Sequence, residues 1–173
     1  MKKNISVIGA GLAGSEAAWQ LAKFGYNVNL YDMKPQKFSA AHKSKNFAEL
    51  VCSNSLKSRR IGSASGMLKE EMRLFDSLIL DCAEKFSVDA GGALAVDREL
   101  FSSEVTRRLS SCEKINIINK EITSIPEGKV IIATGPLTSD ALTTTISKLV
   151  GGEQLHFYDA AAPIISSDSM DMK

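Results

Sequence analysis

The order of apolar and polar residues predicts a strand, a helix and a second strand at the start of the chain. Residues 4–8 form a short β-branched apolar run, which is typical of a buried strand. Small apolar residues recur through residues 12–24 as in a helix, and Gly25 follows at the place of a left-handed C-cap. Residues 26–32 predict the second strand, which ends at Asp32. A right-handed crossover would set the two strands side by side and parallel.

The next part of the chain is first polar and then amphipathic. Residues 33–64 are rich in Lys, Ser and Asn and show no sustained period, which predicts a long loop. One helix is expected after this loop, with a core-facing stripe formed by Leu68, Met72, Phe75 and Ile79. We expect this loop and helix, over about residues 33–90, to form an excursion from the main sheet.

The last part of the chain predicts strands and helices in alternation. A short strand leads to Asp97, a candidate N-cap for the helix that follows. The apolar face of this helix is formed by Phe101, Val105 and Leu109. Further strands are expected at residues 115–119, 121–125 and 129–135. Thr138 is expected to cap a last helix that runs to Leu149 and ends at Gly151 and Gly152.

Together these elements predict an α/β fold with helices on both faces of a mainly parallel sheet. Of the 173 residues, 44% are hydrophobic and 24% are charged, close to the averages of globular proteins. No apolar run approaches the roughly 18 residues that span a bilayer, and the N-terminal run is too short and glycine-broken for a signal peptide. We therefore expect one domain over residues 1–173, located in the cytoplasm and without contact with a membrane.

Cysteine spacing and charge add two constraints. The three cysteines, Cys52, Cys82 and Cys112, include no CxxC pair, which argues against a disulfide framework and against a metal site of the zinc type. We expect Cys82 and Cys112 to be buried. The net charge is +1, but residues 34–69 hold eight basic side chains and one acid, so this segment carries +7 and the remainder −6. Such a segment attracts phosphate or nucleic acid, although a solvated lysine-rich loop has the same composition.

A glycine-rich loop follows the first predicted strand. Gly9, Gly11 and Gly14 form the pattern G-x-G-x-x-G. The first glycine permits a tight turn, the second lets backbone N–H groups approach a pyrophosphate, and the third lets the helix pack closely on the sheet. The helix N-terminus then offers unpaired N–H donors to phosphates. Asp32 stands 18 residues after Gly14, where a carboxylate can accept hydrogen bonds from a ribose. The pattern predicts a dinucleotide site.

A second motif bears on the choice between flavin and nicotinamide. Residues 129–135 read as a strand that ends in Ala133, Thr134 and Gly135. In flavoproteins of the glutathione-reductase type, a strand with this ending passes beside the cofactor. The two motifs together favour FAD in a Rossmann-like FAD-binding domain of that type.

Four segments carry a resemblance to a known family. They are ELVCSNSLKS (49–58), DAGGALAVDRELFS (89–102), ATGPLTSDALT (133–143) and LHFYDAAAPI (155–164). Through essentially its whole length, the chain resembles the folate- and FAD-dependent uracil-5-methyltransferases of bacteria, the TrmFO type, which are related to the GidA and MnmG flavoproteins.

This resemblance implies an enzyme that transfers a one-carbon unit from 5,10-methylenetetrahydrofolate to C5 of a uracil in the T-loop of tRNA. Some relatives modify ribosomal RNA instead. FAD takes part in the transfer and reduction, and NADH or NADPH reduces the flavin. By resemblance, the FAD site comprises Gly9, Ala10, Gly11, Leu12, Ala13, Gly14, Asp32, Ala133, Thr134 and Gly135. Asp32 stands where such flavoproteins more commonly carry Glu, which shortens the reach of the carboxylate.

The resemblance also assigns roles to a cysteine and to the basic segment. Cys52 matches the cysteine proposed to attack uracil C6, and the basic residues near it favour the thiolate form of a cysteine. A thiolate that adds to C6 makes C5 nucleophilic, which C5 alkylation requires. Candidate contacts to RNA phosphates or to the glutamate tail of folate are Lys43, Lys45, Lys57, Arg59 and Arg60. His42 and His156 are candidate polar contacts near the cofactor or folate.

Members of this family are considerably longer, so the resemblance implies that the chain corresponds to their N-terminal portion. We expect it to lack methyltransferase activity on its own. Two alternatives stay open: an FAD- or NAD-dependent oxidoreductase of the same fold, and a non-catalytic module that binds nucleotide or RNA. Bound flavin would separate FAD from nicotinamide, and dependence on Cys52 would separate uracil chemistry from hydride transfer.

Overall fold

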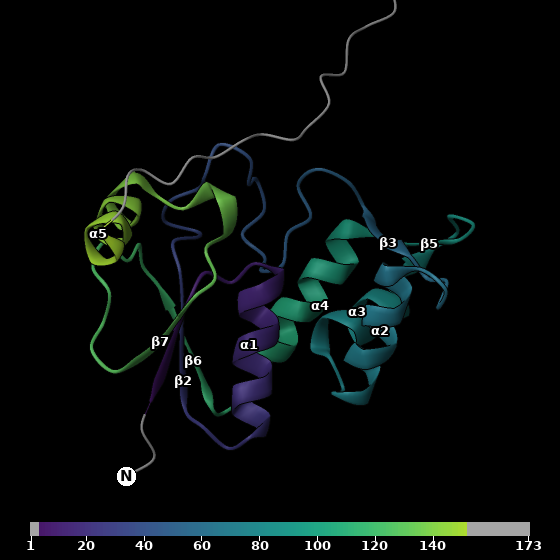
Figure 1. Ribbon diagram of the computed structural model, residues 1–173, viewed down its shortest axis with the longest axis horizontal. Helices are drawn as coiled ribbons and strands as arrows, with labels where there is room; N and C mark the ends of the chain where they lie inside the picture. Colours follow the sequence, from purple (N-terminus) through teal and green to yellow (C-terminus); the bar gives the residue numbers. More distant parts are fainter. Residues whose placement is uncertain (1–3, 152–173) are drawn as a thin grey trace, which may run out of the picture.

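A four-stranded parallel sheet forms the centre of the protein (Figure 1). The computed structural model describes residues 4–151. The strands are β1 (Ile5–Ile8), β2 (Val28–Asp32), β6 (Ile115–Asn119) and β7 (Lys129–Ile132). Their order in the sheet is β6-β2-β1-β7, with Ile5 of β1 opposite both Val28 and Lys129. The predicted parallel pairing of the first two strands is confirmed.

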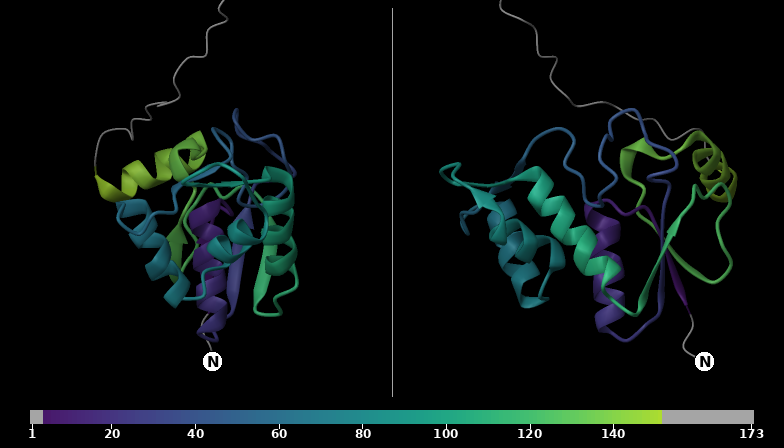
Figure 2. Two further views of the ribbon diagram at one scale, coloured as in Figure 1. Left: turned by 90° about the vertical axis from the view of Figure 1, so that its right-hand side faces the viewer. Right: turned by 180° about the vertical axis from the view of Figure 1, so that it is seen from behind.

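Helices pack against this sheet. α1 (Leu12–Lys23) and α4 (Arg98–Ser110) lie on one side of it, and α5 (Asp140–Val150) lies on the other, near the carboxyl edge of the strands (Figures 1 and 2). The buried face of α1 consists of small residues, which lets the helix approach the sheet closely. Gly25 follows α1 with φ +83°, as expected for a left-handed C-cap.

The predicted cap and apolar face of α4 are confirmed. The Asp97 carboxylate accepts hydrogen bonds from the backbone N–H groups of Glu99 and Leu100, both at 3.0 Å. These bonds satisfy two of the donors that a helix N-terminus leaves free. The face formed by Phe101, Val105 and Leu109 is completely buried. It joins Val7, Val28 and Leu30 of the sheet in one hydrophobic core.

The chain between β2 and α4 builds a second, smaller unit beside α1 and α4 (Figure 1). It contains an antiparallel sheet in the order β3-β5-β4, formed by β3 (Ser55–Ser58), β4 (Ser87–Val88) and β5 (Ala93–Val96). Two helices, α2 (Ala64–Leu74) and α3 (Leu78–Lys85), pack in the same unit. Residues 33–64 are mainly loop, as predicted, apart from β3. The small antiparallel sheet of this unit was not predicted.

The structure corrects the single helix predicted for this region. The chain breaks between α2 and α3 at Asp76, which has φ +50°, and Ser77 begins the next helix by accepting a hydrogen bond from the Leu80 N–H at 3.1 Å. Ile79 is buried as expected, but Leu68 and Phe75 are 55% and 67% exposed. The predicted core stripe is wrong for these two residues because the break turns α3 away from the line of α2.

Two further local predictions are wrong. Residues 121–125 form no strand, since none of them pairs with a strand of the sheet. Thr138 does not cap α5: it follows a short 3-10 helix (η1, Gly135–Leu137) and its hydroxyl donates to the Gly135 carbonyl at 2.8 Å. Ser139 occupies the N-cap position, and Gly151 ends α5 with φ +66° as predicted. Gly152, His156 and the segment 155–164 lie outside the described residues.

The cysteines differ in burial. Cys82 is completely buried, which raises the pKa of its thiol to about 11, whereas Cys112 is half-buried and Cys52 is exposed. The expected burial is therefore met fully by Cys82 and in part by Cys112. Within residues 4–151, no helix is both long and apolar enough to cross a membrane.

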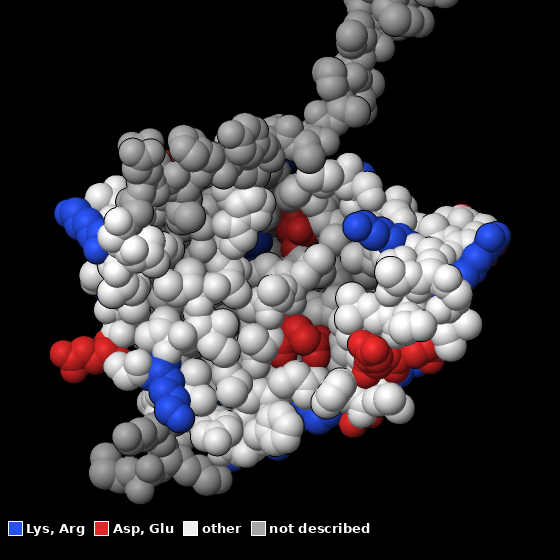
Figure 3. Space-filling view, in the orientation of Figure 1, with Lys and Arg blue, Asp and Glu red and all other residues white. Residues whose placement is uncertain are grey.

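Charged side chains are unevenly distributed over the surface. In Figure 3, basic side chains stand out at the end of the molecule that carries β3 and β5, with acidic side chains below them. Three basic residues of the segment 34–69 have partners within the protein. Lys34 lies near Glu49, and Lys37 forms an ion pair with Glu121. Lys69 donates hydrogen bonds to the carbonyls of Ser58 and Ser65. Five are exposed and have no ion-pair partner within residues 4–151, namely Lys43, Lys45, Lys57, Arg59 and Arg60.

Candidate dinucleotide-binding site

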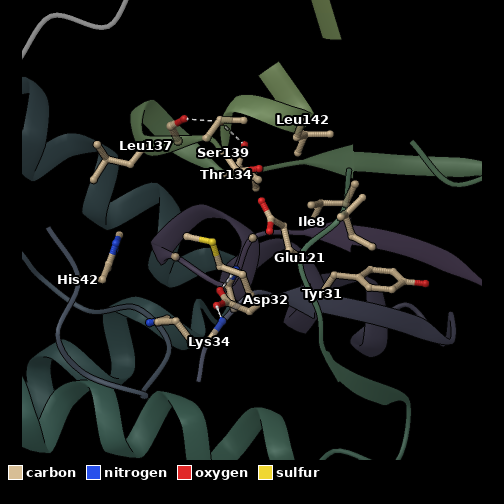
Figure 4. Close-up of a pocket in the computed structure, with 18 of the residues that line it drawn as sticks. Ile8, Tyr31, Asp32, Lys34, His42, Glu121, Thr134, Leu137, Ser139 and Leu142 are labelled. Carbon is tan, nitrogen blue, oxygen red and sulfur yellow. Dashed lines mark hydrogen bonds between the residues drawn. The ribbon is translucent and has the colours of Figure 1, made fainter. Parts of the chain in front are cut away.

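A cleft of about 300 Å³ opens at the carboxyl edge of the parallel sheet (Figure 4). In the order β6-β2-β1-β7, the strand that follows β1 in sequence lies on one side of it and β7 lies on the other. The cleft therefore lies where the direction of the strand order reverses. In open α/β sheets this position is the usual ligand site. Most of the predicted cofactor residues line the cleft, namely Gly9, Ala10, Gly11, Leu12, Ala13, Asp32, Ala133, Thr134 and Gly135. Gly14 is buried in α1 and does not line the cleft.

The three glycines of the loop have different surroundings. Gly9 has φ +96°, and a Cβ atom there would lie 2.6 Å from the Ala133 carbonyl oxygen. A Cβ atom on Gly14 would lie 1.7 Å from the Gly9 carbonyl oxygen. Gly11 differs, since a Cβ atom there would meet nothing within 4 Å. Gly9 and Gly14 are thus required by the fold, and Gly11 leaves free space at the cleft.

Side-chain and backbone hydrogen bonds hold this loop in place. The Ala10 N–H donates to Asp32 Oδ2 at 2.9 Å, and the Ala10 carbonyl accepts from the Ala48 N–H at 2.9 Å and the Ser15 hydroxyl at 3.2 Å. Asp32 Oδ1 accepts from the Lys34 N–H at 2.9 Å. Each carboxylate oxygen has a second lone pair for a ligand hydroxyl, so Asp32 can fix the loop and face the cleft at once.

The N-terminus of α1 faces the same cleft. Gly11 is its N-cap residue and provides no side-chain cap, so the first N–H groups of the helix have no side-chain partner. These donors, the helix dipole and the free space at Gly11 suit a pyrophosphate, and Asp32 suits a ribose hydroxyl. The residues present therefore fit a dinucleotide such as FAD.

Sequence reasoning missed several residues of the cleft. Lys120, Glu121 and Ile122 follow β6 at the same edge, and the parallel topology alone would have placed them there. Glu121 points from below toward Thr134 and Ser139 in Figure 4. The Lys37 ammonium, at 2.8 Å, and the Ser139 hydroxyl hold the pKa of the Glu121 carboxyl below its usual value.

Two more missed residues, Lys34 and Glu49, and the candidate His42 also line the cleft. Lys34 and His42 lie together on one side in Figure 4. His42 Nδ1 is 2.6 Å from the Ser39 hydroxyl. No local pattern marks Lys34 or Glu49, because both come from the polar segment that was expected to be loop.

The family model described as glucose inhibited division protein A matches residues 4–173. The chain belongs to the GidA family. Its fold agrees with this assignment: a solved structure of Aquifex aeolicus GidA superposes with a TM-score of 0.59 over 72% of this chain and 21% of that chain. At 15% identity, this likeness bears on the fold alone. It supports the predicted α/β class with a parallel sheet.

Curated relatives of this GidA-family chain are much more similar in sequence. A protein of Ligilactobacillus salivarius named methylenetetrahydrofolate--tRNA-(uracil-5-)-methyltransferase TrmFO is 59% identical over 172 residues. The Bacillus subtilis protein of the same name is 57% identical over 171 residues. In both cases the alignment covers 99% of this chain, and the chain spans 39% of the length of the relative.

Cys52 itself does not line the cleft. It is exposed and directly follows Val51, which lines the cleft. The Arg98 guanidinium donates to the Leu50 carbonyl at 3.3 Å and so ties this segment to the start of α4. Arg98 therefore has a contact within the protein, and the Cys52 thiol is exposed on the surface.

Proposed function

We propose that this chain carries the FAD-binding part of a methylenetetrahydrofolate-dependent tRNA (uracil-5-)-methyltransferase. The observation that carries the proposal is the 59% identity, over 99% of the chain, to a protein with that name. The cleft supports it independently, because Gly11, the uncapped N-terminus of α1 and Asp32 suit a dinucleotide. In this proposal residues 1–173 form one FAD-binding domain and the target RNA is a T-loop.

Different residues of the cleft would bind different parts of the cofactor. The N–H groups at Leu12 and Ala13 would bind the pyrophosphate, Asp32 would bind the ribose, and the segment around Gly135 would lie along the rest of the cofactor. FAD reduced by NADH or NADPH would supply the electron pair that turns a transferred methylene group into a methyl group. The chain's own task is to hold this cofactor next to the RNA base.

Cys52 would act on the base itself. Its thiolate would add to C6 of the target uracil, which makes C5 nucleophilic toward the one-carbon unit, and loss of the C5 proton would later release the thiolate. Exposure beside Val51 of the cleft supports this role. The exposed and unpaired basic residues, Lys43, Lys45, Lys57, Arg59 and Arg60, would contact RNA phosphates or the glutamate tail of folate.

The cofactor assignment is tested by an absorbance spectrum of the purified chain, recorded before and after FAD is added and the excess is removed. We expect a retained flavin band with FAD and none with FMN, which lacks the adenosine half. Retention of NAD in place of FAD would favour a simple oxidoreductase of the same fold. A colourless protein that releases all FAD would contradict the proposed FAD site.

A further inference from the structure

Glu49 lines the cleft, and one of its carboxylate oxygens lacks a hydrogen-bond donor within residues 4–151. Its Oε1 accepts hydrogen bonds from the backbone N–H groups of Lys43 and Ser44, both at 3.0 Å. Its Oε2 is buried and has no hydrogen-bond partner within residues 4–151. Buried carboxylate oxygens without a donor are unfavourable, so such an atom at a ligand cleft indicates a donor that arrives with the ligand.

Lys34 connects Glu49 to Asp32. Its ammonium lies 3.9 Å from Glu49 Oε2, too far for a hydrogen bond, and donates instead to the Asn46 carbonyl. Its backbone N–H donates to Asp32 Oδ1. Burial lowers the pKa of the Lys34 ammonium, while Asp32 and Glu49 both act to raise it. Lys34 thus holds Asp32 through its backbone and lies within ion-pair distance of Glu49, and all three residues line the cleft. Figure 4 shows Lys34 next to Asp32.

We propose that Glu49 is a second specificity-determining residue of the nucleotide site, and that its Oε2 accepts a hydrogen bond from an O–H or N–H group on the adenosine half of the ligand. This inference rests on the proposed binding of FAD. Adenosine offers three such donors, the two ribose hydroxyls and the amino group of the base. Asp32 takes one of them and Glu49 takes another. Because two carboxylates face this region, the site rejects nucleotides that carry a 2′-phosphate.

Calorimetric titration of the 173-residue chain with ADP and three analogues tests this assignment. The analogues are 2′-deoxy-ADP, 3′-deoxy-ADP and IDP, each of which lacks one donor. The variant is Glu49→Gln. Its amide oxygen can still accept hydrogen bonds from the Lys43 and Ser44 N–H groups, but an amino group replaces the free carboxylate oxygen and the negative charge is lost. The matched control is Glu113→Gln, which removes one charge from an exposed residue next to the opposite edge of the sheet.

We expect Glu49→Gln to weaken ADP binding about tenfold or more and Glu113→Gln to leave it unchanged. The variant also loses its preference for ADP over one of the analogues, and the analogue concerned identifies the donor as a ribose hydroxyl or the base amino group. Unchanged ADP affinity in Glu49→Gln, with the same ranking of analogues, would overturn the proposal.

A second test of the proposal uses only the wild-type chain, so it is valid even if Glu49→Gln fails to fold. With both carboxylates engaged, at least two of the three analogues must bind more weakly than ADP. If only one or none does, Glu49 has no such role. Binding of ADP without retention of FAD would contradict the proposed function but leave this test in force, and a wild-type chain that binds neither would contradict both.

Discussion

Three glycines in the loop after β1 are needed for different physical reasons. Gly14 serves the fold, because a Cβ atom would enter the space of the Gly9 carbonyl oxygen. Gly11 adopts φ −71°, which any residue tolerates, and a Cβ atom there would point into open space. The same residue type thus serves the fold at one position and, three residues away, leaves open the space that the proposed cofactor would fill.

A pair of substitutions separates these two roles. We expect Gly14→Ala to destabilise the protein by about 2 kcal/mol, a drop in Tm of about 6 °C. Gly11→Ala is expected to keep Tm within about 2 °C and to weaken FAD binding by at least tenfold, because its methyl group occupies the space of a pyrophosphate. Thermal unfolding and FAD titration measure the two effects. Equal loss of Tm in both variants would contradict the distinction.

The cysteines make a second prediction for single residues. Cys52 is exposed, whereas burial raises the pKa of Cys82 to about 11. We expect iodoacetamide at mildly alkaline pH to modify Cys52 first and to reach Cys82 only after unfolding, because the thiolate is the reactive form. Peptide mapping by mass spectrometry identifies the modified residue. Cys52→Ser serves as the control, and rapid labelling of Cys82 in the folded chain would contradict its burial.

Among the elements, α3 and α4 are joined through one carboxylate. Glu104 on α4 is 8% exposed and accepts hydrogen bonds from Arg107 and Arg108 of its own helix and from Lys85 of α3. The guanidinium of Arg107, with Lys85 and Arg108, holds the pKa of the Glu104 carboxyl well below its usual range. This acid connects two helices that both contact α1.

This cluster predicts that the protein loses stability as the pH falls. The folded pKa of Glu104 lies below the unfolded value, so its contribution is present above about pH 4.3 and is lost as the pH falls toward the folded pKa. We expect Glu104→Gln to lower Tm at neutral pH and to reduce the fall of Tm with acid. Scanning calorimetry from about pH 7 to pH 2 measures this. Glu113→Gln is the control, and a Glu104→Gln variant with the wild-type acid slope would contradict the prediction.

The accuracy of prediction varied between elements for physical reasons. β1, α1 and β2 follow from local patterns, because their apolar residues repeat with the period of the element they form. β3 has the sequence SLKS and is a strand only because it pairs with β5. The break before α3 depends on Glu16 of α1, which accepts hydrogen bonds from the Ser77 hydroxyl and the Ile79 N–H. Such contacts cannot be read from the sequence.

The same distinction applies to the site. Gly9, Gly11, Asp32 and the segment 133–135 were predicted to lie together and all line one cleft. Their spacing encodes a strand, a turn and a helix, so it also encodes their positions. Glu49 was known only as the one acid of a basic segment. Its place in the cleft depends on how residues 33–54 fold back over the loop after β1.

For the whole molecule, the uneven charge predicts how RNA binding responds to salt. We expect a chain with Lys57, Arg59 and Arg60 changed to Gln to bind a T-loop hairpin more weakly. The slope of log K against log salt should fall by about 0.7–0.9 for each RNA phosphate that the variant no longer neutralises. The control changes three exposed lysines elsewhere to Gln, namely Lys114, Lys129 and Lys148. Fluorescence anisotropy measures both. Equal effects of the two triple variants would indicate non-specific attraction.

The contact between Ala48 and Ala10 couples distant parts of the chain. The Ala48 N–H bonds to the Ala10 carbonyl at 2.9 Å while Asp32 holds the Ala10 N–H, so the glycine-rich loop after β1 and residues 43–49 share one hydrogen-bonded assembly. A ligand that orders the loop therefore slows exchange of the Ala48 amide hydrogen with solvent. Thermodynamic reciprocity requires the converse as well. With the proposed nucleotide site at this loop, a protease cut or a loosening substitution within residues 43–49 is expected to weaken nucleotide affinity, and bound nucleotide is expected to protect that segment.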